Sequence, residues 1–123
     1  MKIVNVTGVL GEDLACDYLK KKGYKILERN FRKKYQEIDV IALHNKTLVF
    51  VEVKTRKSTA FGTPFESIAP WKLKNLIQLA QFYKMLNPKL PENMRIDAIG
   101  VSLNGEKVEK IEHLENIMDI DFT

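Results

Sequence analysis

Residues 37–54 read EIDVIALHNKTLVFVEVK, and this stretch decides the fold. Its two apolar runs are rich in Ile, Val, Leu and Phe, and a short polar segment separates them. Such a pattern is typical of two β-strands joined by a tight turn. We therefore expect antiparallel strands over Glu37–Leu43 and Thr47–Lys54.

Charged residues inside these apolar strands are the first sign of a functional site. A buried charge without a partner is costly, so other groups must compensate for it. If residues 45–46 form a two-residue turn, Asp39 lies opposite Glu52. The same register places Glu37 opposite Lys54 and brings all four side chains to one face of the sheet.

The opposed carboxylates of Asp39 and Glu52 predict a metal site. Opposed like charges repel each other, and a divalent cation between them removes the repulsion. Oxygen ligation of this kind suits Mg²⁺ or Mn²⁺. Lys54, on the same face, would then orient a nucleophilic water or neutralise phosphate charge. The alternative is that Glu37 and Lys54 form an edge salt bridge while the carboxylate pair sits at a solvated strand end.

A helix and one more strand are expected before this hairpin. Apolar residues recur at helical spacing from Leu10 to Leu19, with Thr7 as a candidate N-cap. Gly23 is placed to end the helix in a left-handed conformation. The apolar and aromatic run Tyr24–Phe31 then predicts the first strand.

A second helix and a second hairpin are expected after it. Residues 63–66 resemble a capping box with proline at the first helical position, although Pro70 can reset the helix start. An apolar stripe of helical period extends to Leu86. Asn104 and Gly105 form a strong hairpin turn signal. The strands on either side of it are expected over Met94–Leu103 and Lys107–Ile111.

This α-β-β-β-α-β-β order predicts one α/β domain over residues 1–123, with a mixed sheet of about five strands flanked by helices. A content of 45% apolar and 29% charged residues is typical of globular domains. The only cysteine is Cys16, which excludes an internal disulfide and fits the cytoplasm. No run approaches the roughly 20 apolar residues of a membrane span, so no membrane association is expected.

Positive charge is concentrated in one segment. The net charge is only +4, but residues 20–34 contain eight basic residues and one acidic residue. A dense basic segment suits phosphate-backbone binding, although a solvated lysine face has the same composition. The candidate nucleic-acid-binding residues are Lys20, Lys21, Lys22, Arg29, Arg32, Lys33, Lys34, Arg56 and Lys57.

Three aromatic residues lie near these basic segments in the sequence. Trp71, Phe61 and Tyr35 suit stacking on bases of a distorted or single-stranded substrate. The alternative is that they belong to the core, where aromatic residues are more often found.

The charged hairpin also resembles a nuclease signature. An Asp followed after a turn by Glu-x-Lys resembles the Asp-(Asp/Glu)-x-Lys motif of restriction-endonuclease-like nucleases, and the element order fits their core. The neighbouring residues that sharpen the match are Gly11-Glu12, Ala15, Tyr18-Leu19, Gly23-Tyr24, Arg29-Asn30, Glu37-Ile38-Asp39, Val51-Glu52-Val53-Lys54, Phe61-Gly62 and Glu66. Over residues 8–101 this pattern is similar to the YraN-type family, whose fold resembles archaeal Holliday junction resolvases. The sequence departs from the family pattern at Gln36, where glycine usually precedes Glu-Ile-Asp.

The resemblance implies a restriction-endonuclease-like core and a metal-dependent nuclease acting on phosphodiester bonds in DNA, including branched or junction DNA. It implies that Asp39 and Glu52 bind Mg²⁺ or Mn²⁺, that Lys54 is the catalytic lysine, and that Glu12 is a further catalytic acid. For Glu12 the alternative is an acid in the first helical turn that opposes the helix dipole.

Two other functions fit the same residues. The protein could be a non-catalytic nucleic-acid-binding adaptor on a nuclease-like fold, because fold alone does not decide activity. It could also be a protein-interaction domain in which the carboxylate pair is structural. A homodimer would suit a four-way junction, because both have two-fold symmetry.

Overall fold

A computed structural model describes residues 6–119. The elements follow the predicted order and are α1 (Val6–Lys21), β1 (Lys25–Lys33), β2 (Gln36–His44), β3 (Thr47–Lys57), α2 (Pro70–Leu86), β4 (Met94–Asn104), β5 (Lys107–Leu114) and the 3-10 helix η1 (Ile117–Asp119). The strands form one five-stranded sheet in the order β1-β2-β3-β4-β5. Only β3 and β4 pair in parallel, so the predicted mixed α/β sheet is confirmed.

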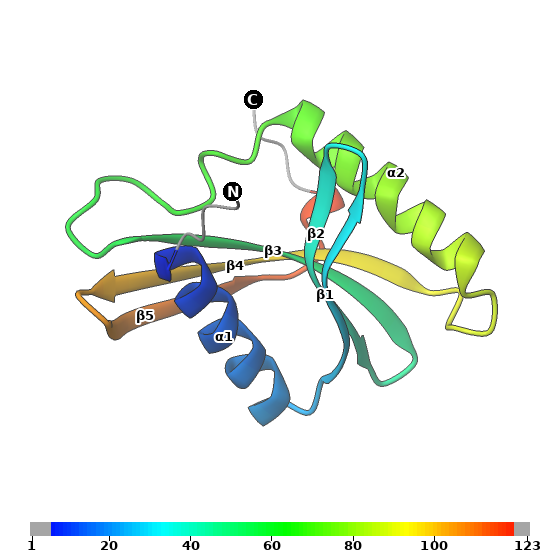
Figure 1. The fold of residues 1–123 in the computed structure, drawn as a ribbon, viewed down its shortest axis with the longest axis horizontal. Coiled ribbons are helices and arrows are strands. Elements are labelled where there is room, and N and C mark those ends of the chain that lie inside the picture. The colour runs from blue at the N-terminus through cyan, green and yellow to red at the C-terminus, as the bar shows by residue number, and fades with distance from the viewer. Residues whose placement is uncertain (1–5, 120–123) are drawn as a thin grey trace.

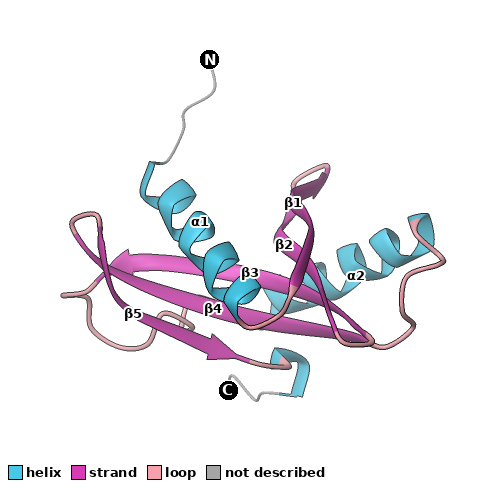
Figure 2. Cartoon of the chain, turned by 90° about the horizontal axis from the view of Figure 1, so that it is seen from below, coloured by secondary structure: helices cyan, strands magenta, loops and turns pink. Residues whose placement is uncertain are grey.

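The two long helices lie on opposite faces of the sheet (Figures 1 and 2). Parallel neighbours need a crossover connection, and α2 supplies it between β3 and β4. No helix within residues 6–119 is both long and apolar enough to cross a membrane.

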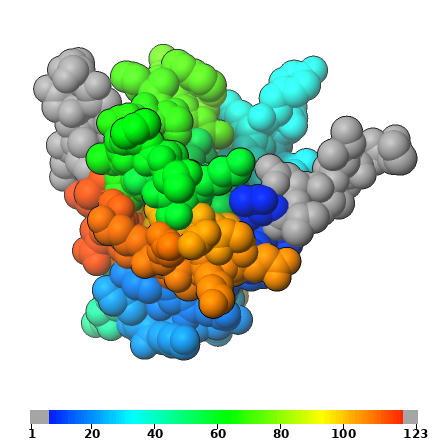
Figure 3. Space-filling view, turned by 90° about the vertical axis from the view of Figure 1, so that its left-hand side faces the viewer, coloured from blue at the N-terminus to red at the C-terminus, as the bar shows by residue number. Residues whose placement is uncertain are grey.

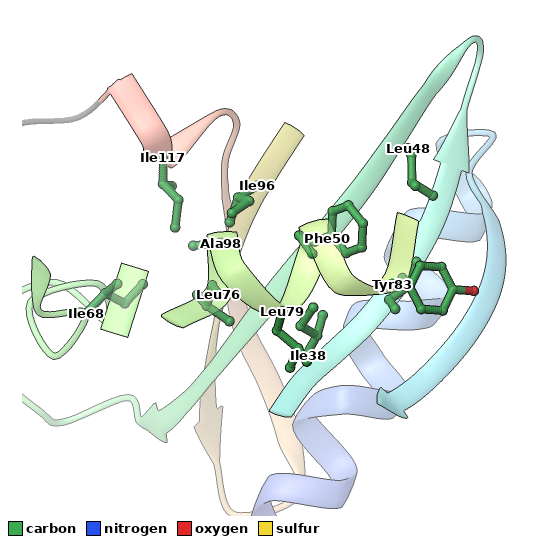
Figure 4. Close-up of a cluster of buried hydrophobic side chains, with 12 residues drawn as sticks. Ile38, Leu48, Phe50, Ile68, Leu76, Leu79, Tyr83, Ile96, Ala98 and Ile117 are labelled. Atoms are coloured by element: carbon green, nitrogen blue, oxygen red, sulfur yellow. The ribbon is translucent and has the colours of Figure 1, made fainter. Parts of the chain in front are cut away.

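The larger core lies between α2 and the sheet (Figure 4). Leu76, Leu79 and Tyr83 recur on one side of α2 and pack on Phe50 of β3. Ile38 of β2 also belongs to this core. The apolar stripe predicted for this helix is therefore its buried face.

The second core lies under α1, where Ala15, Cys16 and Leu19 pack against Val40 and Val51. Val40 thus faces α1, although Ile38, two residues earlier on the same strand, belongs to the α2 core. In a regular strand, residues two apart point to the same face of the sheet. The alternation of side chains in β2 is therefore broken at the residue between Ile38 and Val40. That residue is Asp39.

The β2–β3 register follows the prediction over five pairs, from His44 with Thr47 to Val40 with Val51. The two-residue turn at residues 45–46 is confirmed, and Asn45 adopts φ 56° there. The side-chain period of a strand makes register decisive for a site, because a slip of one residue would move Asp39 and Glu52 to the other face.

Three predicted boundaries differ from the structure. Thr7 is not an N-cap, because α1 already includes Val6. Residues 64–67 form a turn instead of a helix start, and α2 begins at Pro70, the other candidate start. A residue before proline avoids the helical conformation, and Ala69 is accordingly extended at φ −77° and ψ 157°. The second hairpin turns at Gly105 and Glu106, one residue later than predicted.

At Gly11, α1 lies close to β3. A Cβ at this residue would lie 1.8 Å from Thr55 Oγ1 and 2.9 Å from Thr55 Cβ. We expect Gly11→Ala to lower the free energy of unfolding by about 1–3 kcal/mol, because overpacking forces α1 away from the sheet. Chemical denaturation measures this, and the same substitution in a Thr55→Ala background should cost less. Equal costs in the two backgrounds would contradict the close approach.

Candidate functional site

The site begins where β2 separates from β3. Their ladder ends at the pair Val40 and Val51, after which β2 continues with β1 as a two-stranded arm and β3 continues beside β4 (Figure 1). Asp39 and Glu52 are the first residues beyond the ladder. Asp39 Oδ2 accepts a 2.7 Å hydrogen bond from the Val53 N–H. At the point where the two strands separate, which we call the fork, the Asp39 carboxylate accepts the hydrogen bond that a backbone carbonyl of a paired strand would otherwise accept.

Three acidic side chains converge beside this fork. Glu12 comes from α1, and Glu37 and Asp39 come from β2. One carboxylate oxygen of each lies within 4.8 Å of the others, and all three residues are partly buried. We refer to Glu12, Glu37 and Asp39 as the carboxylate cluster. A set of hard oxygen donors of this kind suits Mg²⁺ or Mn²⁺.

Asn30 of β1 holds two members of the cluster in place. Its Nδ2 donates to Glu12 Oε1 at 2.8 Å and to Glu37 Oε1 at 3.1 Å. Asn30 adopts φ 55°, a left-handed conformation that asparagine tolerates better than most residues. In this left-handed conformation, the side-chain amide of Asn30 lies within hydrogen-bond distance of both carboxylates. Sequence reasoning included Asn30 in the family pattern but gave it no role in the site.

Two arginines of β1 form ion pairs on the outer side of the cluster. Arg29 pairs with Asp13 at 2.8 Å and lies 3.9 Å from Glu12. Arg32 pairs with Glu37, which is also its neighbour across the β1–β2 ladder. These cations offset part of the negative charge that the three carboxylates bring together.

Burial and neighbouring charge act strongly on the carboxyl group of Asp39. Burial, followed by the nearby charge of Glu52, raises the pKa of Asp39 to about 8, while the Val53 hydrogen bond opposes the shift. The charges of Glu12 and Glu37 add smaller increases. Without a cation, Asp39 therefore keeps a proton at neutral pH. A bound cation would favour the ionised form.

Glu52 is buried next to the cluster, with a side chain only 7% exposed. Its Oε1 lies 3.5 Å from Lys54 Nζ and 4.0 Å from Lys72 Nζ. Its Oε2 is buried without a hydrogen-bond partner among the residues that the structure describes. Burial raises the pKa of Glu52, and the two lysines partly reverse this. A buried oxygen without a partner calls for an explanation. A cation held by the carboxylate cluster and by Glu52 would supply that partner.

The predicted catalytic residues are distributed over one connected region. Asp39 and Glu12 meet in the carboxylate cluster, and Glu52 and Lys54 form an ion pair beside Asp39. The first-turn explanation of Glu12 is wrong, because the first turn of α1 contains no acidic residue. The β2–β3 ladder ends at Val40 and Val51, so neither the expected pairing of Glu37 with Lys54 nor that of Asp39 with Glu52 is part of it.

Sequence reasoning placed Glu37 on the face of the site but not among its ligands, and it missed Lys72. Glu37 joins the carboxylate cluster because β2 is not paired with β3 at this position. Lys72 reaches Glu52 from the first turns of α2, which follow β3 only after a loop of twelve residues. Local spacing carries no signal for a contact of this kind.

The candidate nucleic-acid-binding residues occupy separate places. Lys20, Lys21 and Lys22 lie where α1 ends, whereas Lys33 and Lys34 lie at the tip of the β1–β2 hairpin (Figure 1). The nine residues of β1 separate the two groups by roughly 30 Å. The basic segment is therefore not one continuous face.

The remaining basic candidates differ in their partners. Arg29 and Arg32 are ion-paired to acids of the site, as described above. Arg56 donates to the carbonyl oxygens of Phe61 and Gly62 and thereby fixes the loop after β3. Lys57 is exposed at the end of β3.

All three candidate stacking residues are exposed, so their assignment to the core is wrong. Tyr35 and Phe61 are fully exposed, and Trp71 is 67% exposed. Tyr35 lies at the turn of the β1–β2 hairpin, and Trp71 lies in the first turn of α2. Phe61 lies in the loop between β3 and α2.

Comparison with known proteins identifies the family. The sequence profile described as "Uncharacterised protein family UPF0102" matches residues 11–101, which include every residue of the candidate site. A UPF0102 protein of Caldanaerobacter subterraneus is 47% identical over 120 residues, covering 94% of this chain and 98% of that protein.

Two further UPF0102 proteins show the same degree of likeness. The one of Alkaliphilus oremlandii is 49% identical over 112 residues, and the one of Syntrophomonas wolfei is 44% identical over 109 residues. Each of these matches covers 89% of this chain and 94% of the relative. The chain therefore belongs to the UPF0102 family, as its resemblance to the YraN-type proteins implied.

Proposed function

We propose that the protein is a metal-dependent nuclease that hydrolyses phosphodiester bonds in DNA. The observation that carries this proposal is the convergence of Glu12, Glu37 and Asp39 next to the buried, unpartnered Oε2 of Glu52. The arginine and lysine partners offset only part of the charge of these four acidic side chains, and a bound cation would offset more of it. Their oxygen donors would hold Mg²⁺ or Mn²⁺, and the cation, when bound, would polarise a phosphate oxygen as a Lewis acid.

The protein's own groups have distinct roles in this proposal. Asn30 is a positioning residue, because it holds Glu12 and Glu37 by hydrogen bonds and touches no reacting atom. Lys54 is held 3.5 Å from Glu52 at the edge of the cluster. An ammonium group in this place can orient water toward a phosphate and stabilise the negative charge that develops on its oxygens.

The basic residues support a nucleic acid as the partner. Lys33 and Lys34 lie at the hairpin tip, close in sequence to Glu37, and offer phosphate contacts near the cluster. Lysine contacts to phosphate hold the backbone without reading its sequence. The proposed substrate is DNA, including branched and junction forms.

A cleavage panel tests this function. Linear duplex, single-stranded, flap and four-way-junction DNA are incubated with Mg²⁺ or Mn²⁺, and with EDTA as the metal-free control. We expect cleavage that requires the metal and falls at least about tenfold in Glu12→Gln, because the cluster loses one charged ligand. Asp17→Asn is the matched control, since Asp17 is an exposed acid on the same helix.

Two outcomes would contradict the nuclease. Cleavage that persists in EDTA would exclude the carboxylate cluster as its metal site. DNA binding without cleavage in any metal would instead support the adaptor, in which the cluster only shapes the fork between β2 and β3.

A further inference from the structure

A cleft separates the tip of the β1–β2 hairpin from α2 and leads to the candidate site. Its volume is about 540 Å³, and it is lined by the turn residues Lys34 and Tyr35 on one side and by Trp71 and Gln78 on the other. Figure 3 shows the hairpin tip, in cyan, projecting from the body of the protein near α2, in green. This is the volume of a small-molecule-sized binding site.

A smaller hollow of about 140 Å³ continues the cleft toward the carboxylate cluster. The two share Tyr35 and Trp71, and the smaller one also reaches Glu37 and Lys72. Glu37 belongs to the cluster, and Lys72 contacts Glu52. A chain lying in the cleft would therefore arrive at the proposed cleavage site.

The mouth of the cleft carries two large aromatic side chains that the protein itself does not bury. Tyr35 is fully exposed and Trp71 is 67% exposed, and they come from different elements. Exposed aromatic faces of this kind are stacking platforms for bases, and every base has a face that can stack. In a duplex these faces are already occupied by neighbouring bases, so stacking here requires unpaired nucleotides.

The other residues of the cleft suit the same ligand. Asn75 and Gln78 of α2 and Gln36 of β2 each present an amide with both donor and acceptor atoms. An unpaired base exposes the hydrogen-bonding edge that such amides recognise. Lys33 and Lys34 add positive charge on the hairpin side, which complements a phosphate backbone.

We propose that this cleft binds an unpaired stretch of DNA and directs it to the carboxylate cluster. Tyr35 and Trp71 stack on successive bases, and the amides of α2 contact their edges. The substrate class of the nuclease is then DNA with a single-stranded segment, such as a flap or an opened junction. This last step rests on the proposed nuclease function, whereas the binding itself does not.

Binding is measured without catalysis, in EDTA, with a labelled oligothymidylate and a blunt duplex of the same length. Trp71 is the only tryptophan of the chain, so its fluorescence reports directly on the cleft. We expect the single strand to quench this fluorescence and to bind more tightly than the duplex. Tyr35→Ala and Trp71→Ala should each weaken single-strand binding by about 5- to 100-fold, and Trp71→Phe should restore most of it.

Phe61→Ala is the matched control. Phe61 is also a fully exposed aromatic residue, but it does not line the cleft. Losses in Tyr35→Ala and Trp71→Ala no larger than in Phe61→Ala would overturn the proposal. So would an unchanged Trp71 fluorescence at saturating single strand, or equal effects on the single strand and the duplex.

The two proposals fail in different ways. If the protein cleaves DNA but Tyr35→Ala and Trp71→Ala bind and cleave like the wild type, the cleft is not the binding site and the nuclease stands. If the single strand binds in the cleft but no metal supports cleavage, the nuclease fails and the cleft stands. If the protein does not bind oligothymidylate at all, the assignment of the cleft to unpaired DNA is refuted, and the cleft would then bind a partner of another class.

Discussion

Asp39→Asn is expected to stabilise the metal-free protein by about 1–4 kcal/mol at pH 7. In the wild type, burial and the charge of Glu52 raise the pKa of Asp39 from 3.8 to about 8. Each unit of such a shift corresponds to about 1.4 kcal/mol, and at pH 7 only the part of the shift between about pH 4 and pH 7 counts, which sets the upper end of the range. Asparagine removes the ionisable group and keeps an oxygen that can accept the Val53 hydrogen bond.

The raised pKa of Asp39 also predicts the direction in which the stability of the wild type changes with pH. A carboxyl whose pKa is raised by folding binds more protons in the folded state, so the free energy of unfolding falls as pH rises. The window runs from about pH 4, the ordinary pKa, to about pH 8, the folded pKa. Urea denaturation in EDTA at pH 5, 7 and 8 should show that the free energy of unfolding of the wild type falls as pH rises. In Asp39→Asn, the part of this fall that Asp39 causes should be absent.

Added Mn²⁺ should reverse the order of the two proteins. A ligand that binds only the folded state stabilises it, and the wild type keeps all the proposed ligands. We expect Mn²⁺ to bind the variant at least about tenfold more weakly in calorimetry. Asp17→Asn should behave like the wild type in both measurements. An Asp39→Asn variant that is less stable in EDTA, yet binds Mn²⁺ normally, would remove Asp39 from the metal site.

Much of the fold follows from local sequence patterns. The apolar runs on either side of residues 45–46 led to the correct turn and register, because a two-residue loop leaves no freedom in the pairing. Gly23 ends α1 with φ 91°, as its position predicted. Two starts are possible for α2, at Pro64 within the Thr-Pro-Phe-Glu pattern of residues 63–66 and at Pro70, and the helix uses Pro70.

The site was predictable only as far as the hairpin register extends. The predicted register brought Asp39 and Glu52 near each other, although the ladder ends one pair before them, and the family resemblance supplied Glu12. The place where β2 leaves β3 depends on how the whole sheet twists, which no local pattern records. For that reason the role of Glu37 and the pairing of Lys72 with Glu52 appeared only in the structure.

Exposed aromatic residues are a second limit of sequence reasoning. A tyrosine or tryptophan has the same hydrophobic signal in a core and in a binding cleft. Tyr35 and Trp71 were ambiguous for this reason, and their exposure decides the question. Phe61 has the same sequence signal but lies outside the cleft, so only the structure separates it from the other two.

Lys54→Ala is expected to reduce the cleavage rate at least about 100-fold while changing DNA affinity less than about threefold. The reason is that charge stabilisation acts mainly when charge develops on the phosphate, and losing one such donor commonly costs 100- to 1,000-fold. The structure supports the assignment, because Lys54 Nζ lies 3.5 Å from Glu52 Oε1 and its side chain is 27% exposed.

The measurement separates chemistry from binding by combining single-turnover cleavage at saturating protein with anisotropy in EDTA. Lys46→Ala is the matched control, since Lys46 is an exposed lysine at the opposite end of the same hairpin. Equal losses of cleavage and affinity in Lys54→Ala would make Lys54 a binding residue. Cleavage at the wild-type rate would remove Lys54 from the mechanism and would leave Lys72, whose Nζ lies 4.0 Å from Glu52 Oε1, as the next lysine to test.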